Sequence, residues 1–139
     1  MRARHSKYRR HTVPCPECSG ECVLVDGPHG MRYQCRSFPE CDTYGDAHAD
    51  GSPMAIPARR KVRKARSLAH SYFDRLWQFE GCLPGRAAYT RKKAYAWLAA
   101  QLGIRVEDCH IGHFDAAVCG VVVELSKKKI NELRRRVAA

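Results

Sequence analysis

Four cysteines in two close pairs constrain the fold of this chain more than any other feature. Two residues separate Cys15 from Cys18, five separate Cys35 from Cys41, and sixteen lie between the two pairs. A zinc ion binds four thiolates in a tetrahedron, and each close pair can form a tight turn that directs two sulfur atoms at one point. The spacing therefore predicts one structural zinc site with these four cysteines as ligands.

The sequence between the two pairs is typical of a β-hairpin. "ECVLVD" is β-prone, "GPHG" consists largely of turn formers, and "MRYQC" has apolar or aromatic residues at alternate positions. A hairpin flanked by two cysteine turns is a zinc ribbon, which we place at residues 13–49. A segment of about 40 residues buries too little apolar surface to fold alone, so zinc would supply much of its folding free energy.

Other roles for these thiols fit the sequence less well. A redox pair at Cys15 and Cys18 would leave the second pair without a purpose. Cys22 is a third sulfur near the first turn, and we expect it to be a small buried or half-exposed thiol rather than a ligand, because the first pair already has the usual two-residue gap.

The N-terminal sequence and the cysteine content indicate a reducing compartment. "MRARHSKYRRHTVPCPEC" is basic but lacks the apolar segment of a secretory signal, and no apolar run reaches the roughly 18 residues of a membrane span. In such a compartment eight cysteines are expected to be metal ligands or free thiols. We therefore expect a cytoplasmic protein that does not associate with a membrane.

The cysteine turns resemble those of a known family. "CPECSG", the strand after it and "CRSFPEC" are similar to the C-terminal zinc ribbons of bacterial type IA DNA topoisomerases, whose second turn carries an aromatic residue and a proline between its cysteines. The resemblance covers about 30 residues and implies binding of single-stranded DNA. Nothing in the chain resembles the topoisomerase catalytic core, so strand cleavage is not implied.

A longer resemblance extends into the second half of the chain. The ribbon together with "LAHSYFDRLW", "TRKKAYAWLAAQLGI" and "EDCHIGHFDAAVC" resembles a family of bacterial and phage proteins described as a zinc-finger-containing domain. It covers residues 14 to about 125 and implies a fold without implying an activity. A phage-encoded member would act in the cytoplasm of its bacterial host.

The second half is predicted to be helical. "DAHADGSPMAIPAR" has the composition of a linker, which we place at residues 50–58. Apolar residues from Leu68 to Trp77 then recur at helical spacing, which predicts an amphipathic helix that ends at Gly81. A second helix follows in "RKKAYAWLAAQL", with Thr90 as its N-cap and Gly103 as its C-cap.

A third helix is predicted to begin after Asp115. The three valines at 121–123 favour a strand by propensity, but Val118, Val121, Val122 and Leu125 fit one helical face. The basic end of the chain either continues this helix or restarts at Ser126. The fold class is thus a small zinc-dependent α+β protein. Its expected parts are a basic arm (1–12), the zinc ribbon (13–49), a linker (50–58), a helical domain of about three helices (59–125) and a basic helix or tail (126–139).

The charge distribution points to a polyanionic partner. The chain has 25 Lys and Arg against 14 Asp and Glu, a net charge of +11, and 20 of the cations fall within residues 1–10, 59–66, 91–93 and 127–136. A solvated surface explains such clusters less readily than contacts with phosphates do. The residues expected to contact nucleic acid are Arg9, Arg10, Arg32, Tyr33, Arg36, Phe38, Arg59, Arg60, Lys61, Arg63, Lys64, Arg91, Lys92, Lys93, Lys127, Lys128, Arg134 and Arg135.

Aromatic residues of the ribbon offer a second kind of contact. Tyr33, Phe38 and Tyr44 are candidates to stack on unpaired bases. For Phe38 the alternative is that its ring fills the space beside the metal.

The segment "CHIGHFD" is the place where catalysis or a second metal would be sought. We expect no second zinc site at Cys82, Cys109, His113 and Cys119, because their spacing is irregular and a capped loop explains them. A nuclease at His110, His113 and Asp115 would have fewer carboxylates than metal-dependent nucleases use.

The sequence therefore predicts a non-enzymatic protein that binds nucleic acid, DNA rather than RNA, and that has no small-molecule substrate. The alternative is a protein-interaction module, such as a phage or mobile-element factor that docks on a host polymerase.

Overall fold

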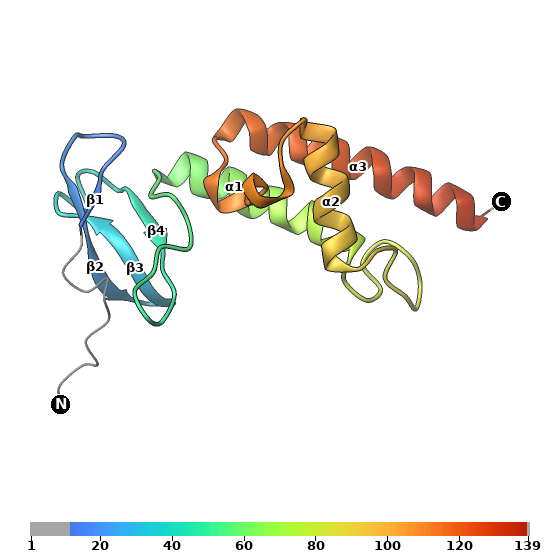
Figure 1. Ribbon diagram of the computed structural model, residues 1–139, viewed down its shortest axis with the longest axis horizontal. Coiled ribbons are helices and arrows are strands. Elements are labelled where there is room, and N and C mark those ends of the chain that lie inside the picture. The colour runs from blue at the N-terminus through green and yellow to red at the C-terminus, as the bar shows by residue number, and fades with distance from the viewer. Residues whose placement is uncertain (1–11, 139) are drawn as a thin grey trace. The chain divides into compact units, whose positions relative to one another are not determined.

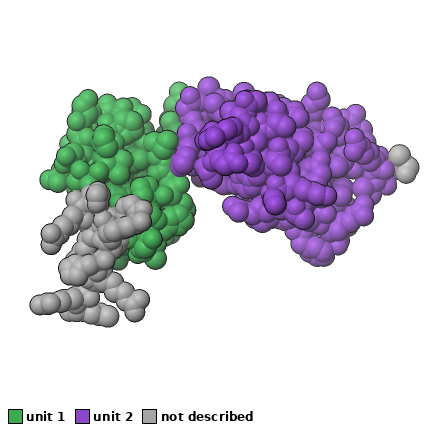
Figure 2. All heavy atoms as spheres, in the orientation of Figure 1, with its two compact units in different colours: residues 1–63 green, residues 64–139 purple. Residues whose placement is uncertain are grey.

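A computed structural model of the protein describes residues 12–138. The chain divides into two compact units, Met1–Arg63 and Lys64–Ala139 (Figure 2). Each unit has its own hydrophobic core. Arg9 and Arg10, which the sequence predicted to contact nucleic acid, lie outside the described residues.

The first unit is built on a four-stranded antiparallel sheet in which the strands follow one another in chain order (Figure 1). Its strands are β1 (Val13–Pro14), β2 (Glu21–Gly27), β3 (Gly30–Cys35) and β4 (Tyr44–Asp46). The second and third form the predicted hairpin, with Gly27 opposite Gly30 at the turn. The expected ribbon is confirmed, and the structure adds a strand on each side of the hairpin.

The segment 50–58 is folded onto this sheet. Bridges join Ala47 to Pro53 and Tyr44 to Ala58. A Cβ on Gly45 would lie 2.8 Å from the carbonyl oxygen of Ala55, so only glycine lets the segment pass this close to β4. The expectation of a linker was wrong here, because the same glycines and prolines also permit a close return of the chain.

The second unit contains α2 (Arg91–Leu102), α3 (Ala116–Ala138) and the end of α1 (Arg60–Phe73), with short 3-10 turns η1 (Asp74–Leu76), η2 (Val106–Asp108) and η3 (Ile111–His113). The largest fully buried side chains of its core come from several of these elements. They are Phe73, Leu76, Leu98, Ile111 and Val122.

The ends of α2 are those that the sequence predicted. The Thr90 hydroxyl accepts a hydrogen bond from the Lys93 backbone N–H at 3.1 Å, and Gly103 has a left-handed φ of 68°. Both caps work through neighbouring residues alone, which is why the sequence was sufficient to locate them.

The third helix is confirmed and is continuous. The Asp115 carboxylate accepts a hydrogen bond from the backbone N–H of Val118 at 2.9 Å, and α3 then continues without interruption to Ala138. Ser126 is buried within it, so the basic end of the chain is the second half of α3 and does not restart as a separate element.

The first helix differs from its prediction. It ends at Phe73 and is followed by η1 as far as Leu76, so it does not reach Gly81. Leu68, which was expected on the apolar face, is 52% exposed. None of the described helices combines the length and apolar character needed to cross a membrane.

Candidate metal centre and basic residues

The four predicted cysteines lie together at one end of the sheet. The sulfur atoms of Cys15 and Cys41 are 3.7 Å apart, those of Cys18 and Cys35 are 3.5 Å apart, and all four lie within 4.8 Å of one another. A tetrahedral zinc ion with bonds of about 2.3 Å requires sulfurs about 3.8 Å apart. Four thiols from two turns thus match the chemistry and size of a single structural zinc site.

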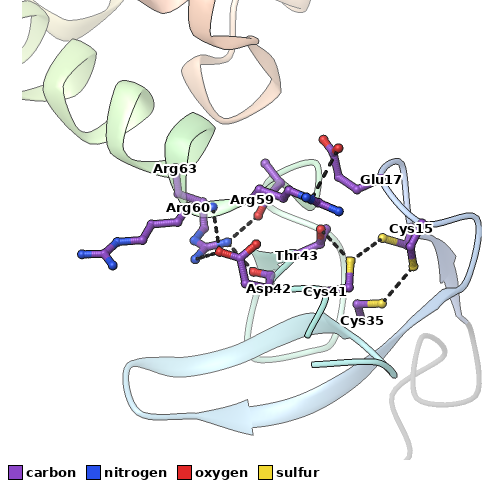
Figure 3. A network of polar contacts seen from close by, with 11 residues as sticks. Cys15, Glu17, Cys35, Cys41, Asp42, Thr43, Arg59, Arg60 and Arg63 are labelled. Atoms are coloured by element: carbon purple, nitrogen blue, oxygen red, sulfur yellow. Dashed lines mark hydrogen bonds and ion pairs between the residues drawn. The ribbon is translucent and has the colours of Figure 1, made fainter. Parts of the chain in front are cut away.

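The backbone of the two turns holds these sulfurs in place. The N–H of Cys15 donates to the Gly20 carbonyl at 2.8 Å, and the N–H of Cys41 donates to the Ser37 carbonyl at 3.0 Å. Cys15, Cys35 and Cys41 are buried, whereas Cys18 is exposed. Figure 3 shows the sulfurs of Cys15, Cys35 and Cys41 gathered at this point.

Hydrogen-bond donors favour the thiolate form at two of the ligands. Burial raises the pKa of Cys15, but N–H groups of Glu17 and Cys18 and the Thr43 hydroxyl outweigh it and lower the pKa to about 6. The Thr43 hydroxyl also lowers the pKa of Cys41. Because zinc binds thiolates, these donors prepare the site for the metal.

The pKa values of Cys18, the exposed ligand, and of Cys22, which is not a ligand, are raised instead. The Gly20 N–H lowers the pKa of Cys18, but the sulfurs of Cys35 and Cys15 raise it to about 12. Cys22 is fully buried, and burial followed by the charges of Cys15 and Cys35 raises its pKa to about 12. Cys22 is therefore a buried core thiol, as the sequence predicted, and its raised pKa favours the neutral form.

The cysteines of the second unit belong to its hydrophobic core. Cys82, Cys109 and Cys119 are buried, and burial raises the pKa of each. Within residues 12–138 the cluster of Cys15, Cys18, Cys35 and Cys41 is the one group with the spacing of metal ligands.

One predicted nucleic-acid contact on the ribbon is contradicted by the structure. Tyr33 is 1% exposed, and its hydroxyl donates a hydrogen bond to the Gly51 carbonyl at 2.7 Å. It therefore cannot stack on a base. The alternation of "MRYQC" did not reveal which face of β3 is covered, because the covering residues around Gly51 come from the segment expected to be a linker.

Arginines already cover the ring of Tyr44. The guanidinium carbon of Arg32 lies 4.0 Å from the ring centroid and that of Arg63 lies 3.7 Å from it. Arg32 also donates to the Gln34 side chain at 2.6 Å and 3.0 Å. Phe38 is half-buried and packs edge-on against Tyr44, and the Arg32 guanidinium carbon lies 5.5 Å from its ring centroid, so arginine covers the Phe38 ring less closely than the Tyr44 ring.

The basic residues at the start of α1 are of two kinds. Arg59 pairs with Glu17 at 3.6 Å and Arg63 pairs with Asp42 at 3.7 Å. Arg60, Lys61 and Lys64 are exposed, and no carboxylate of the described residues pairs with them.

The basic run at the start of α2 borders a hollow of about 560 Å³. Arg91 and Lys92 line it together with Tyr95, Val106, Cys109 and His110. The Arg91 guanidinium lies over the rings of Trp77 and Tyr95, 5.5 Å and 5.0 Å from their centroids. The sequence pointed to Arg91, Lys92 and Lys93, but His110 joins them only through the folding of the loop after α2.

The predicted cations in the second half of α3, and Arg36 in the second cysteine turn, are partly engaged within the protein. Lys127 pairs with Glu124 at 3.7 Å, and the Arg134 side chain donates to the Cys82 carbonyl at 3.2 Å. Arg135 donates to the Asn131 carbonyl at 3.3 Å, and on the ribbon Arg36 pairs with Glu21 at 3.5 Å. Lys128 is exposed, with no ion-pair partner among the described side chains.

Comparison with known proteins agrees with the metal centre. Searches of curated proteins and of solved structures found no match. The model of a family described as a zinc-finger-containing domain matches residues 11–129, which include all four ligands and most of the helical unit. This chain belongs to that zinc-finger-containing family.

Proposed function

We propose that this zinc-binding protein binds nucleic acid, DNA rather than RNA, and catalyses no reaction on it. The preference for DNA follows from the resemblance of its ribbon to those of type IA topoisomerases. The zinc ion has a structural role, because the four cysteines occupy its whole coordination sphere and leave no position for a substrate.

The observation that carries the proposal is the exposure of basic side chains that no carboxylate neutralises. Arg60, Lys61 and Lys64 at the start of α1 and Arg91 and Lys92 at the start of α2 are exposed, and the described residues offer none of them an ion-pair partner. Such cations keep their full attraction for phosphates.

The position of the cations at the start of α2 adds to this attraction for phosphates. Arg91, Lys92 and Lys93 form the first turn of α2, which contains no acidic residue. The positive end of a helix dipole and its free backbone N–H groups favour phosphate at the same place.

A direct test is fluorescence anisotropy of the zinc-loaded full chain with labelled single-stranded and duplex DNA and RNA, titrated across salt. We expect affinity to fall steeply as salt rises, since each neutralised phosphate contributes roughly 0.7–0.9 to the slope of log affinity against log salt. Affinity no better than millimolar at low salt would exclude the proposal.

Paired variants identify the surface. Replacing Lys92 and Lys93 together by alanine removes two exposed cations, and we expect a shallower salt slope. Arg105→Ala is the control, because Arg105 is also exposed but is paired with Asp108 at 3.1 Å. The control removes one charge and the double variant two, so a loss from the control half as large as that of the double variant would mean that only overall charge matters.

A second candidate function is that of an interaction module docking on a host polymerase. The observation in its favour is a set of exposed apolar side chains in the second unit, with Phe79 71% exposed, Leu68 52% and Val121 49%. Retention of one host protein after nuclease treatment, lost on Phe79→Ser, would favour this alternative.

A further inference from the structure

Asp42 connects the metal centre to the basic start of α1. We propose that Asp42 is a positioning residue, through which the zinc-bound cysteine turn holds the start of α1, and with it the side chain of Arg60, unpaired among the described residues, in the arrangement that meets phosphates. The role in phosphate binding rests on the proposed function, whereas the connection itself does not.

The first part of this connection lies at the metal centre. Asp42 stands between Cys41, a zinc ligand, and Thr43, which is buried. The Thr43 hydroxyl lies 3.3 Å from the Cys41 sulfur, and the Thr43 carbonyl accepts a hydrogen bond from the Cys35 N–H at 2.9 Å. The backbone on both sides of Asp42 is thus fixed to metal ligands.

The second part of the connection joins the Asp42 side chain to the first residue of α1 (Figure 3). The Asp42 carboxylate accepts a hydrogen bond from the backbone N–H of Arg60 at 3.2 Å. This N–H is the first of α1 and has no partner within the helix. Asp42 therefore caps a helix that begins 18 residues later in the sequence.

The same residue also holds the Arg63 side chain. Nη1 of Arg63 donates to the Asp42 carbonyl oxygen at 2.6 Å, and its Nη2 lies 3.7 Å from the carboxylate. With the Tyr44 ring 3.7 Å away as well, the guanidinium is held from several sides. Arg63 is itself paired and mostly buried, so it fixes the first turn of α1, which carries the side chains of Arg60 and Lys61, unpaired within the described part of the chain. A turn that is fixed before binding loses less conformational entropy when those side chains meet a phosphate.

A second connection joins the other cysteine turn to the same helix start. Glu17 lies between the ligands Cys15 and Cys18, and its carboxylate is 3.6 Å from Nε of Arg59. Both cysteine turns thus contact the start of α1 through residues that are not ligands themselves. Zinc binding would fix the two turns and thereby order their contacts with α1. Because coupling between two binding sites is reciprocal, a nucleic acid that orders the same contacts would raise the affinity for zinc.

Two variants with the same charge separate positioning from electrostatics. Asp42→Ala and Asp42→Asn both remove one negative charge beside the basic cluster, so charge alone predicts that both bind nucleic acid more tightly and to the same extent. Asparagine caps a helix about as well as aspartate, whereas alanine does not. Positioning by Asp42 therefore predicts that Asp42→Ala binds several-fold more weakly than Asp42→Asn.

The connection itself is tested without nucleic acid, by hydrogen exchange of the full chain with zinc and with a chelator. In the wild type we expect zinc to slow hydrogen exchange of the Arg60 and Arg63 backbone amides by about fivefold. This is the change in the opening equilibrium that a helix-capping hydrogen bond of ordinary strength produces. Asp42→Asn should retain most of this effect and Asp42→Ala should lose most of it, keeping only what the Glu17–Arg59 pair and the Arg63 bond to the main-chain carbonyl of residue 42 supply. The Leu98 amide in α2 is the internal control and should not respond to zinc.

The two measurements fail independently. Equal zinc-dependent protection in the wild type and in Asp42→Ala would overturn the positioning role, as would equal nucleic-acid affinities of the two variants. If the wild type shows the expected exchange pattern but binds no nucleic acid, the connection stands and the proposed function is wrong. Zinc titration of each variant confirms that both retain the metal.

Discussion

The hydroxyl oxygen of Thr43 lies 3.3 Å from the sulfur of Cys41, and both side chains are buried. A donor at this position stabilises the thiolate that zinc requires. Thr43 is not a ligand, yet it contacts one ligand through its side chain and another, Cys35, through its backbone.

We expect Thr43→Val to lower zinc affinity by roughly 10–100-fold, the usual effect of losing a hydrogen bond to a metal ligand. Valine has nearly the same shape, so packing is retained while the donor is lost. Competition with a chromophoric chelator measures the affinity. Thr43→Ser keeps the hydroxyl and should bind zinc nearly as well as the wild type; a loss as large as that of Thr43→Val would assign the effect to packing.

Removal of zinc should affect the two units unequally. The core of the first unit consists mainly of the ligands and a few neighbours, so we expect the ribbon to unfold on chelation. The second unit has its own core and should keep its helices. Metal analysis should find one zinc per chain, and far-ultraviolet circular dichroism after chelation should retain the helical signal. Loss of that signal would show that the second unit depends on the metal.

Tyr33 and Phe38 should respond differently to substitution. Tyr33→Phe removes the hydrogen bond to the Gly51 carbonyl and should lower the free energy of unfolding by about 1 kcal/mol, with no change in nucleic-acid affinity. Phe38→Ala should weaken binding of a single strand, by about 1–3 kcal/mol if one base stacks on the ring. Denaturant unfolding and anisotropy measure the two effects. Weaker binding by Tyr33→Phe would contradict its buried position.

The stability of the second unit should fall at alkaline pH. Burial raises the pKa of Cys82, Cys109 and Cys119 above the ordinary value of 9.0. As pH rises through 9, these thiols ionise in the unfolded chain before they ionise in the folded one, so the unfolded state binds fewer protons and is favoured. The stabilisation is therefore complete below pH 9 and is lost above it.

Both tryptophans of the chain, Trp77 and Trp97, lie in the second unit, so their fluorescence follows its unfolding. Cys119→Ala removes one of the three thiols and should make the decline with pH shallower. Stability that does not change between about pH 8 and 10 would contradict the buried, neutral state of these thiols.

The sequence by itself determined the metal site and the caps of the second and third helices. The four ligands were identified because zinc coordination demands close pairs of thiols, a requirement that spacing expresses directly. Thr90, Gly103 and Asp115 were identified because a cap bonds to backbone groups only a few residues away. Each of these features depends on local chemistry.

Only the tertiary structure decided which of the remaining residues are available to a partner. Tyr33 is buried because Gly51 returns to the sheet, and Leu68 is exposed because no part of the described core covers it. Asp42 reaches the start of α1 across 18 residues of sequence. The hydrophobic periodicity of one segment does not predict such contacts, since they depend on how separate segments pack against one another.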